Sequence, residues 1–154
     1  MSTRAPLSRR RMLAAGATAA TMAALAPFAP AHAEPQETDA LARQLMGPFT
    51  AKDGKVHLKI KETAESGANE PVGVVVDSPM TPADHVKAIH ILAEGNPYPV
   101  VASWYLTPRS GRAEVNFRMR LAKTQFIRAY AVTSDGSVWV DRQEVKVTIG
   151  GCGG

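Results

Sequence analysis

The stretch AEVNFRMR, residues 113–120, decides the fold class. Apolar residues occupy its odd positions and polar or charged residues its even positions, so the two kinds alternate strictly. Side chains on a β-strand point to opposite faces in turn, and this period of two predicts a strand with one buried and one solvated face.

Six further runs with strand character lie on either side of this stretch. They are residues 56–60, 72–76, 87–93, 100–106, 126–132 and 138–149. Turn-forming residues separate them, such as Thr107–Gly111 and the short hairpin loop Ser134–Ser137. Seven short strands separated by turns predict an all-β fold, specifically an immunoglobulin-like β-sandwich.

A short helix is predicted ahead of the sandwich, over Asp39–Met46. Thr38 is the expected N-cap, and Gly47-Pro48 is the expected stop because proline cannot continue a helix. We therefore assign residues 34–50 to an N-terminal helical segment and residues 51–149 to the sandwich.

The strands at 126–132 and 138–149 are irregular in two respects. Trp139 and Val145 are apolar residues at odd positions, yet Asp141 and Gln143 between them are polar, which predicts a β-bulge or a corner near 141–143. Residues 129–132 and 138–140 are also apolar on both faces, whereas a solvated sheet face should be polar. We expect a partner subunit to cover that face.

The first 33 residues have the features of an export signal. Arg9 and Arg10 precede the apolar run 14–26, and the small residues Ala31-His32-Ala33 form a cleavage site. Paired arginines in this position are typical of the twin-arginine pathway. The apolar run is too short and too alanine-rich for a permanent membrane span. The sequence predicts a periplasmic protein without a membrane anchor in its mature form.

The formal net charge of +4 comes from the predicted export signal. The 18 basic residues include four arginines within residues 1–33, which leaves 14 basic against 14 acidic residues in the remainder. A mature chain of zero formal charge, without a Lys/Arg cluster, gives no electrostatic footprint for nucleic acid or an anionic membrane. Both classes of partner are excluded on this reasoning.

The only cysteine of the chain, Cys152, lies in the terminal sequence GGCGG. One cysteine cannot form a disulfide within its own chain, so in an oxidising compartment it is an intermolecular partner or a reactive thiol. Gly150, Gly151, Gly153 and Gly154 have no side chains to pack and lose the most entropy on ordering. Residues 150–154 are therefore predicted to be a flexible arm that presents the thiol, since a resident catalyst needs a fixed and supported group.

Several motifs resemble those of the SoxY family of sulfur-oxidation carriers. They are VVVDSPMT (74–81), KAIHI (87–91), TPRSGRAEV (107–115), SDGS (134–137) and VKVTI (145–149) running into GGCGG. The similarity spans roughly residues 72–154, and a terminal GGCGG after a β-rich domain is highly specific.

This resemblance implies a carrier that holds sulfur species covalently on Cys152 and has no cofactor or catalytic residues of its own. It implies a heterodimer with a SoxZ-like subunit. The implied enzymes are a c-type haem enzyme that conjugates thiosulfate to the thiol, a dimanganese hydrolase that releases sulfate, and a sulfane dehydrogenase.

Two other functions stay open at this point. One is a binding module without a covalent role, for which Cys152 is dispensable. The other is a ubiquitin-like sulfur carrier loaded on the carboxylate of Gly154, which needs ATP-dependent activation that is absent outside the cytoplasm.

Other residues suggest little chemistry. His57, His85 and His90 lack metal-ligand spacing, and His57 and His90 are expected to face solvent on strands. Arg109 and Arg112 flank a turn and are more simply explained as solvated charges than as contacts to an anionic cargo.

Overall fold

The computed structural model describes residues 35–149 as one α-helix, one short 3-10 helix and nine strands. In chain order these are α2 (Pro35–Met46), β1 (Ala51–Lys52), β2 (Val56–Lys59), β3 (Thr63–Ser66), β4 (Glu70–Val76), β5 (Val86–Ala93), β6 (Val100–Tyr105), η2 (Pro108–Ser110), β7 (Glu114–Met119), β8 (Gln125–Thr133) and β9 (Val138–Ile149). The predicted all-β fold with a short N-terminal helix is confirmed. All seven predicted strands are present, and the two-residue β1 and four-residue β3 are additional.

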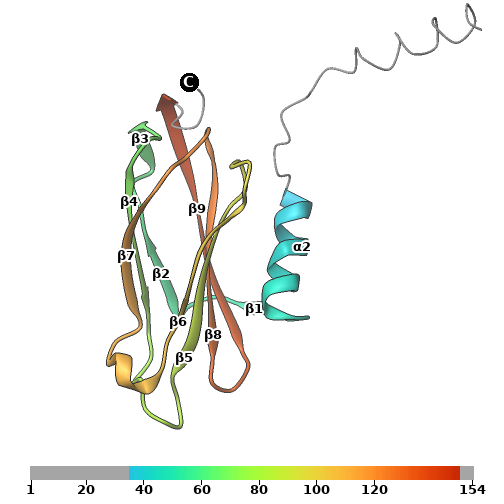
Figure 1. Ribbon diagram of the computed structural model, residues 1–154, viewed down its shortest axis with the longest axis vertical. Helices are drawn as coiled ribbons and strands as arrows, with labels where there is room; N and C mark the ends of the chain where they lie inside the picture. The colour runs from blue at the N-terminus through green and yellow to red at the C-terminus, as the bar shows by residue number, and fades with distance from the viewer. Residues whose placement is uncertain (1–34, 150–154) are drawn as a thin grey trace, which may run out of the picture. The chain divides into compact units, whose positions relative to one another are not determined.

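The strands form two sheets that pack face to face (Figure 1). One is three-stranded with the order β2-β4-β7, and all its pairs are antiparallel. The other has six strands in the order β1-β9-β8-β5-β6, with β3 as a further partner of β9. β1 and β3 both run parallel to β9, while β5, β6, β8 and β9 pair antiparallel.

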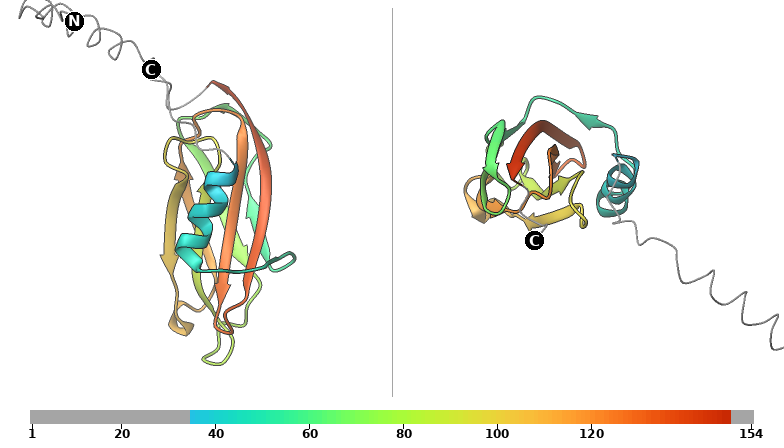
Figure 2. Two further views of the ribbon diagram at one scale, coloured as in Figure 1. Left: turned by 90° about the vertical axis from the view of Figure 1, so that its right-hand side faces the viewer. Right: turned by 90° about the horizontal axis from the view of Figure 1, so that it is seen from above.

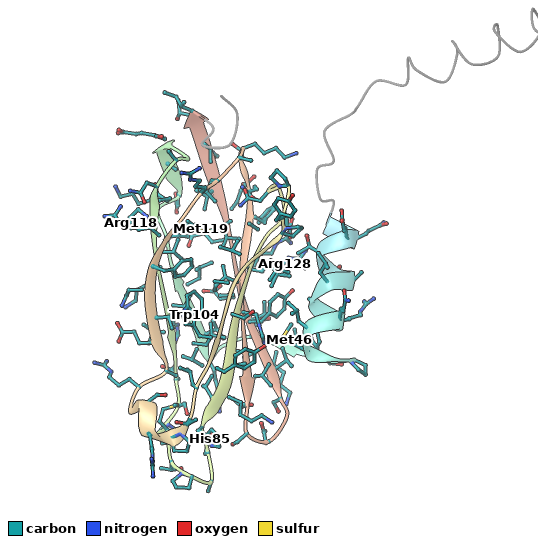
Figure 3. The ribbon with its side chains drawn as sticks, viewed as in Figure 1. Met46, His85, Trp104, Arg118, Met119 and Arg128 are labelled. Carbon is teal, nitrogen blue, oxygen red and sulfur yellow. The ribbon has the colours of Figure 1, made fainter. Side chains whose placement is uncertain are left out.

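The core lies between the two sheets and is built from their inward-facing residues. Val72, Val74 and Val76 of β4 face Ile89 and Ile91 of β5, and all five are buried. Each such side chain contributes roughly 1.5–3 kcal/mol by leaving water. Between the layers, the ring of Trp104 packs on that of Phe117 with centroids 4.8 Å apart (Figure 3).

The predicted bulge or corner near 141–143 is wrong, because β9 is one unbroken strand and the β8–β9 register is continuous from Gln125↔Val145 to Val132↔Val138. Asp141 and Gln143 do point inward, and both bind the backbone of β2 or the residue after it. Asp141 Oδ2 accepts the Leu58 N–H at 2.7 Å, and Gln143 Nε2 donates to the Ile60 carbonyl at 2.9 Å. The two polar side chains satisfy the free edge of β2 that would otherwise be left without partners.

α2 lies against the outer face of the six-stranded sheet, as Figure 2 shows. Its apolar contacts form a buried cluster of Ala42, Leu92, Tyr130 and Val138, flanked by Met46, Phe49, Val132 and Val140. The helix begins at Pro35 rather than Asp39, and the predicted N-cap Thr38 is instead a buried residue inside it. It ends as predicted at Met46, and the next residue, Gly47, has a φ of 76°, which suits glycine.

This packing changes the interpretation of the strands that are apolar on both faces. Residues 129–132 and 138–140 turn one side to the core and the other to α2. The prediction that a partner subunit must cover this face is therefore wrong as far as α2 reaches, because the chain covers it with its own helix.

Charged groups also join α2 to the sheet through Arg128 of β8 (Figure 3). The Arg128 side chain is only 12% exposed and pairs with Asp39 of α2 and with Glu94, to which its N–H groups donate at 2.5 Å. Burial opposes its charge, but hydrogen bonds to Tyr130, Asp39 and Glu94 hold the pKa of Arg128 above its ordinary value. It therefore stays a cation beside two carboxylates.

Candidate functional site

The predicted attachment residue Cys152 and the four glycines beside it lie outside the described residues 35–149. The predicted export signal, residues 1–33, also lies outside them. The structure does describe how the strand that precedes the glycines is held, and this sets the position from which the predicted arm starts.

The last residues of β9 are bonded on both edges. Beyond the start of β8, β9 continues alongside β3, with Thr63↔Lys146 and Ser66↔Ile149 as the outermost pairs. On its other side, the Val147 N–H donates to Thr124 Oγ1 at 2.9 Å. The sheet thus supports β9 for several residues beyond its hairpin with β8.

A chain of backbone hydrogen bonds fixes the end of β9 to two neighbouring loops. The Gly67 N–H donates to the Ile149 carbonyl at 2.7 Å, and the Leu121 N–H donates to the Gly67 carbonyl at 2.7 Å. These bonds tie β9 to the β3–β4 loop and to the β7–β8 loop. The residue before Gly150 is therefore part of the sandwich, and Figure 1 shows this end of β9 beside β3.

The same end of the sandwich contains a group of buried polar side chains. Gln125 Nε2 donates to Asn96 Oδ1 at 2.9 Å, and Gln125 Oε1 accepts the Gly95 N–H at 2.6 Å. Glu70 is 6% exposed, and its Oε1 has no hydrogen-bond partner. Polar groups, rather than apolar packing alone, thus line the end of the core from which β9 leaves.

The histidines take structural positions. His57 is exposed as predicted, and its Nε2 lies 2.8 Å from Asp77 Oδ2. His90 was predicted to face solvent, but it is 3% exposed and its Nδ1 lies 2.7 Å from Ser103 Oγ. Burial lowers the pKa of His90. Within residues 35–149, no three His, Cys, Asp or Glu side chains are grouped to hold a metal ion.

The predicted arginines lie at the other end of the sandwich. Arg109 is part of η2, and Arg112 follows it with its guanidinium 3.6 Å from Glu114. The start of β5 and the end of β8, where Val86 pairs with Thr133, are at this end of the sandwich. The end of β9, where the Gly67 N–H donates to the Ile149 carbonyl, is at the opposite end. The structure therefore does not bring Arg109 or Arg112 together with the end of β9.

Sequence reasoning missed the role of Arg128. The signal was present, because Arg128 is the only charged residue in the otherwise apolar run 126–132. A lone charge in a buried strand must find a partner, and Asp39 and Glu94 supply it here.

The fold is shared with proteins of another function. A superoxide reductase (neelaredoxin) variant from Ignicoccus hospitalis matches with a TM-score of 0.55 and 20% identity, covering 74% of this chain and 92% of that one. A putative superoxide reductase from Thermotoga maritima matches with a TM-score of 0.54 and 17% identity, covering 63% and 93%. At such low identity the likeness shows the fold alone.

Sequence and structure together define a small β-sandwich protein in which β9, the last described strand, directly precedes the cysteine-bearing sequence GGCGG. The family described as sulfur oxidation protein SoxY matches residues 42–152. The structure of the sulfur carrier protein SoxY from Chlorobium limicola f. thiosulfatophilum matches with a TM-score of 0.63 and 30% identity, covering 73% of this chain and 92% of that one. No curated protein matches significantly.

The chain therefore belongs to the SoxY family. The predicted role as a sulfur carrier of the Sox sulfur-oxidation system is confirmed at the level of the family. Within residues 35–149, no helix is long and apolar enough to cross a membrane.

Proposed function

We propose that this chain holds sulfur intermediates covalently on Cys152 and presents them to separate enzymes of the Sox system. One observation carries the proposal: β9 is bonded on both edges as far as Val147 and on the β3 side as far as Ile149, and GGCGG, which contains the only cysteine, follows at once. The family match extends to Cys152.

The four glycines give this thiol reach and a narrow profile. Three residues beyond Ile149 span roughly 10 Å when fully extended, which takes Cys152 clear of the sheet edge. A segment without side chains enters a channel that would exclude a bulkier chain. Ile149, the residue before these glycines, is held by a hydrogen bond from the Gly67 N–H. In this proposal, the thiol changes position while the sandwich stays undisturbed.

The proposed chemistry at Cys152 has two steps, oxidative conjugation of thiosulfate and hydrolytic release of sulfate. In the first, the thiol sulfur forms a bond to the outer sulfur of thiosulfate, a proton leaves, and the conjugating enzyme takes up two electrons, which its haem would accept one at a time. In the second, water attacks the terminal sulfonate group at the active site of the dimanganese hydrolase. Sulfate leaves, and a persulfide remains on Cys152 for the sulfane dehydrogenase or another acceptor. The carrier supplies only the sulfur atom at which these bonds form and break.

The partners and compartment follow from the same proposal. A SoxZ-like subunit forms a heterodimer with the chain, the twin-arginine signal exports it to the periplasm, and the enzymes supply every cofactor. In this scheme residues 1–33 are the export signal, 34–50 the helical segment, 51–149 the carrier domain and 150–154 the arm.

Replacement of the thiol tests the proposal in cells that oxidise thiosulfate. We expect Cys152→Ser to abolish thiosulfate-dependent oxygen uptake, while the protein accumulates to the wild-type level. A binding module without a covalent role predicts unchanged uptake. Deletion of Gly154 alone is the matched control, because it abolishes loading on a terminal carboxylate but leaves Cys152 in place. Loss of uptake on that deletion, with Cys152→Ser active, would contradict the proposal.

A further inference from the structure

The outer face of the three-stranded sheet has a hollow of about 650 Å³ near the end from which β9 leaves. Its rim carries Lys59 and Lys61 on one side and Asn116 and Arg118 on the other, with Pro71 and Gly73 of β4 between them. We call these six residues the cationic hollow.

Gly73 accounts for the shape of the cationic hollow. It lies opposite Lys59 of β2 and Asn116 of β7 in the ladder, so a side chain at this position would stand between theirs. A Cβ on Gly73 would lie 2.8 Å from Asn116 Oδ1. The glycine therefore lets the two flanking side chains close in above a floor of backbone.

The charges of the cationic hollow are not neutralised by the described part of the chain. Neither Lys59 nor Lys61 has an ion-pair partner within residues 35–149, and Arg118 donates only to the Asn69 carbonyl, at 3.3 Å. No acidic side chain is among the described residues that line it. Three cations thus share one concave surface.

The other half of the same sheet face is different. There His57 lies 2.8 Å from Asp77, and Arg112 lies 3.6 Å from Glu114. Acidic groups thus lie beside His57 and Arg112 on the half away from the end of β9, whereas Lys59, Lys61 and Arg118 on the nearer half have no ion-pair partner within residues 35–149. Asn116 at the boundary donates to Glu114 Oε1 at 3.2 Å. A uniformly solvated face gives no reason for this division.

Hydrogen bonds place the cationic hollow near the end of β9. Gly67 bonds both Ile149 at the end of β9 and Leu121 just after β7, and Glu70 pairs with Met119, next to Arg118. In Figure 3, Arg118 and Met119 lie toward the end of the molecule at which β9 ends. An enzyme that takes up Cys152 must approach this end.

We propose that the cationic hollow is the docking surface for an acidic patch on the enzymes that act on Cys152; this rests on the proposed function. Exposed, unpaired ammonium groups on an open surface suit attraction of an acidic protein surface better than tight binding of one small oxyanion, which needs desolvated and convergent donors. Such attraction speeds encounter, and a docked enzyme raises the effective concentration of the arm at its active site.

The test uses the full-length mature chain with its partner subunit and the purified c-type haem conjugating enzyme. The variant Lys59→Glu/Lys61→Glu is compared with Arg109→Glu/Arg112→Glu, which makes the same change in net charge at the opposite end of the sandwich. We expect the first variant to lower kcat/KM for loading of Cys152 about tenfold at low salt with kcat retained. The loss should shrink at 0.5 M salt, where the screening length is only about 4 Å.

The outcomes separate this proposal from the proposed function. If wild type is never loaded on Cys152, the carrier function itself fails. If wild type is loaded and the Lys59→Glu/Lys61→Glu variant is loaded equally fast at low salt, the docking surface is wrong. Equal losses in the two variants would also overturn it, because they would show an effect of net charge alone. So would a loss that a raised thiosulfate concentration restores, since the hollow would then bind the small anion.

Discussion

The two outer faces of the sandwich differ in whether the chain covers them. On the six-stranded sheet, α2 covers an apolar face that includes Tyr130 and Val138, and Arg128 fastens the helix with buried charges. On the three-stranded sheet, the face is bare, polar and free of any covering element within residues 35–149. The comparison teaches that an apolar outer face does not by itself indicate a partner protein, because a helix distant in sequence can cover it.

Two arginines ten positions apart give the largest contrast between these faces. Arg128→Ala removes a buried cation and leaves Glu94 desolvated without its main partner, so we expect a loss of about 3 kcal/mol in the free energy of unfolding. Arg118→Ala on the bare face should change it by less than about 0.5 kcal/mol. Urea unfolding at neutral pH measures both, and similar losses for the two variants would refute the distinction.

Two alanines on opposite sides of α2 give the next contrast. Ala42 is 1% exposed against the sheet, whereas Ala40 faces solvent. Ala42→Glu places a carboxylate under the helix and should destabilise the protein by about 2 kcal/mol or release α2 from the sheet. Ala40→Glu should do neither. Urea unfolding with limited proteolysis of α2 distinguishes them, and equal protease resistance in both variants would show that α2 is not bound as described.

Residues 150–154 lie outside the described part of the chain, and we expect the free energy of unfolding to be insensitive to substitutions there. Gly151→Ala and Gly153→Ala each add a methyl group beside Cys152, which costs about 1 kcal/mol or more if an enzyme channel admits only backbone or requires positive φ. We expect roughly fivefold slower conjugation and sulfate release, with an unchanged melting temperature. Wild-type turnover in both variants would leave the glycines as a passive spacer.

The smallest expected effect is on the pH dependence of the free energy of unfolding, through the buried residue His90. Burial lowers the pKa of His90 below its ordinary value of 6.5, so the unfolded chain binds more protons than the folded one just below that pH. The stability from neutral His90 is complete above pH 6.5 and declines as pH falls through that value. Unfolding free energies at pH 8 and pH 5.5 should differ less in His90→Gln than in wild type, and equal differences would contradict the assignment.

The strand pattern of the sandwich was readable because β2 and β7 alternate apolar and polar residues, while β5 and β8 are short apolar runs between turn-forming residues. β1 and β3 were not predicted because β1 has two residues and β3 has a single apolar residue, Ala64, so neither shows a period, and both pair with β9. Asp141 and Gln143 suggested an irregularity because polar side chains are not expected to point inward. They do so because they form hydrogen bonds with the edge of β2 and the residue after it, more than 80 positions away in the sequence. Local pattern cannot show such long-range pairing, and the cover provided by α2 was missed for the same reason.

The candidate site likewise has one part that the sequence predicted and one part that it did not. Cys152 and its glycines were identified from composition alone, because a single thiol among four glycines needs no tertiary structure to be noticed. The cationic hollow was not, since Lys59 and Arg118 are brought together only by the strand order β2-β4-β7. Each lysine or arginine by itself resembles an ordinary solvated side chain.

The most direct test of the account is the intact mass of the mature protein purified without reductant from cells grown on thiosulfate. The account predicts a fraction whose mass is raised by one sulfur atom or by an S-thiosulfonate group, with the addition on the C-terminal peptide that contains Cys152 and absent from Cys152→Ser. A bare or merely glutathionylated thiol in every preparation, or a sulfur addition that persists in Cys152→Ser, would contradict it.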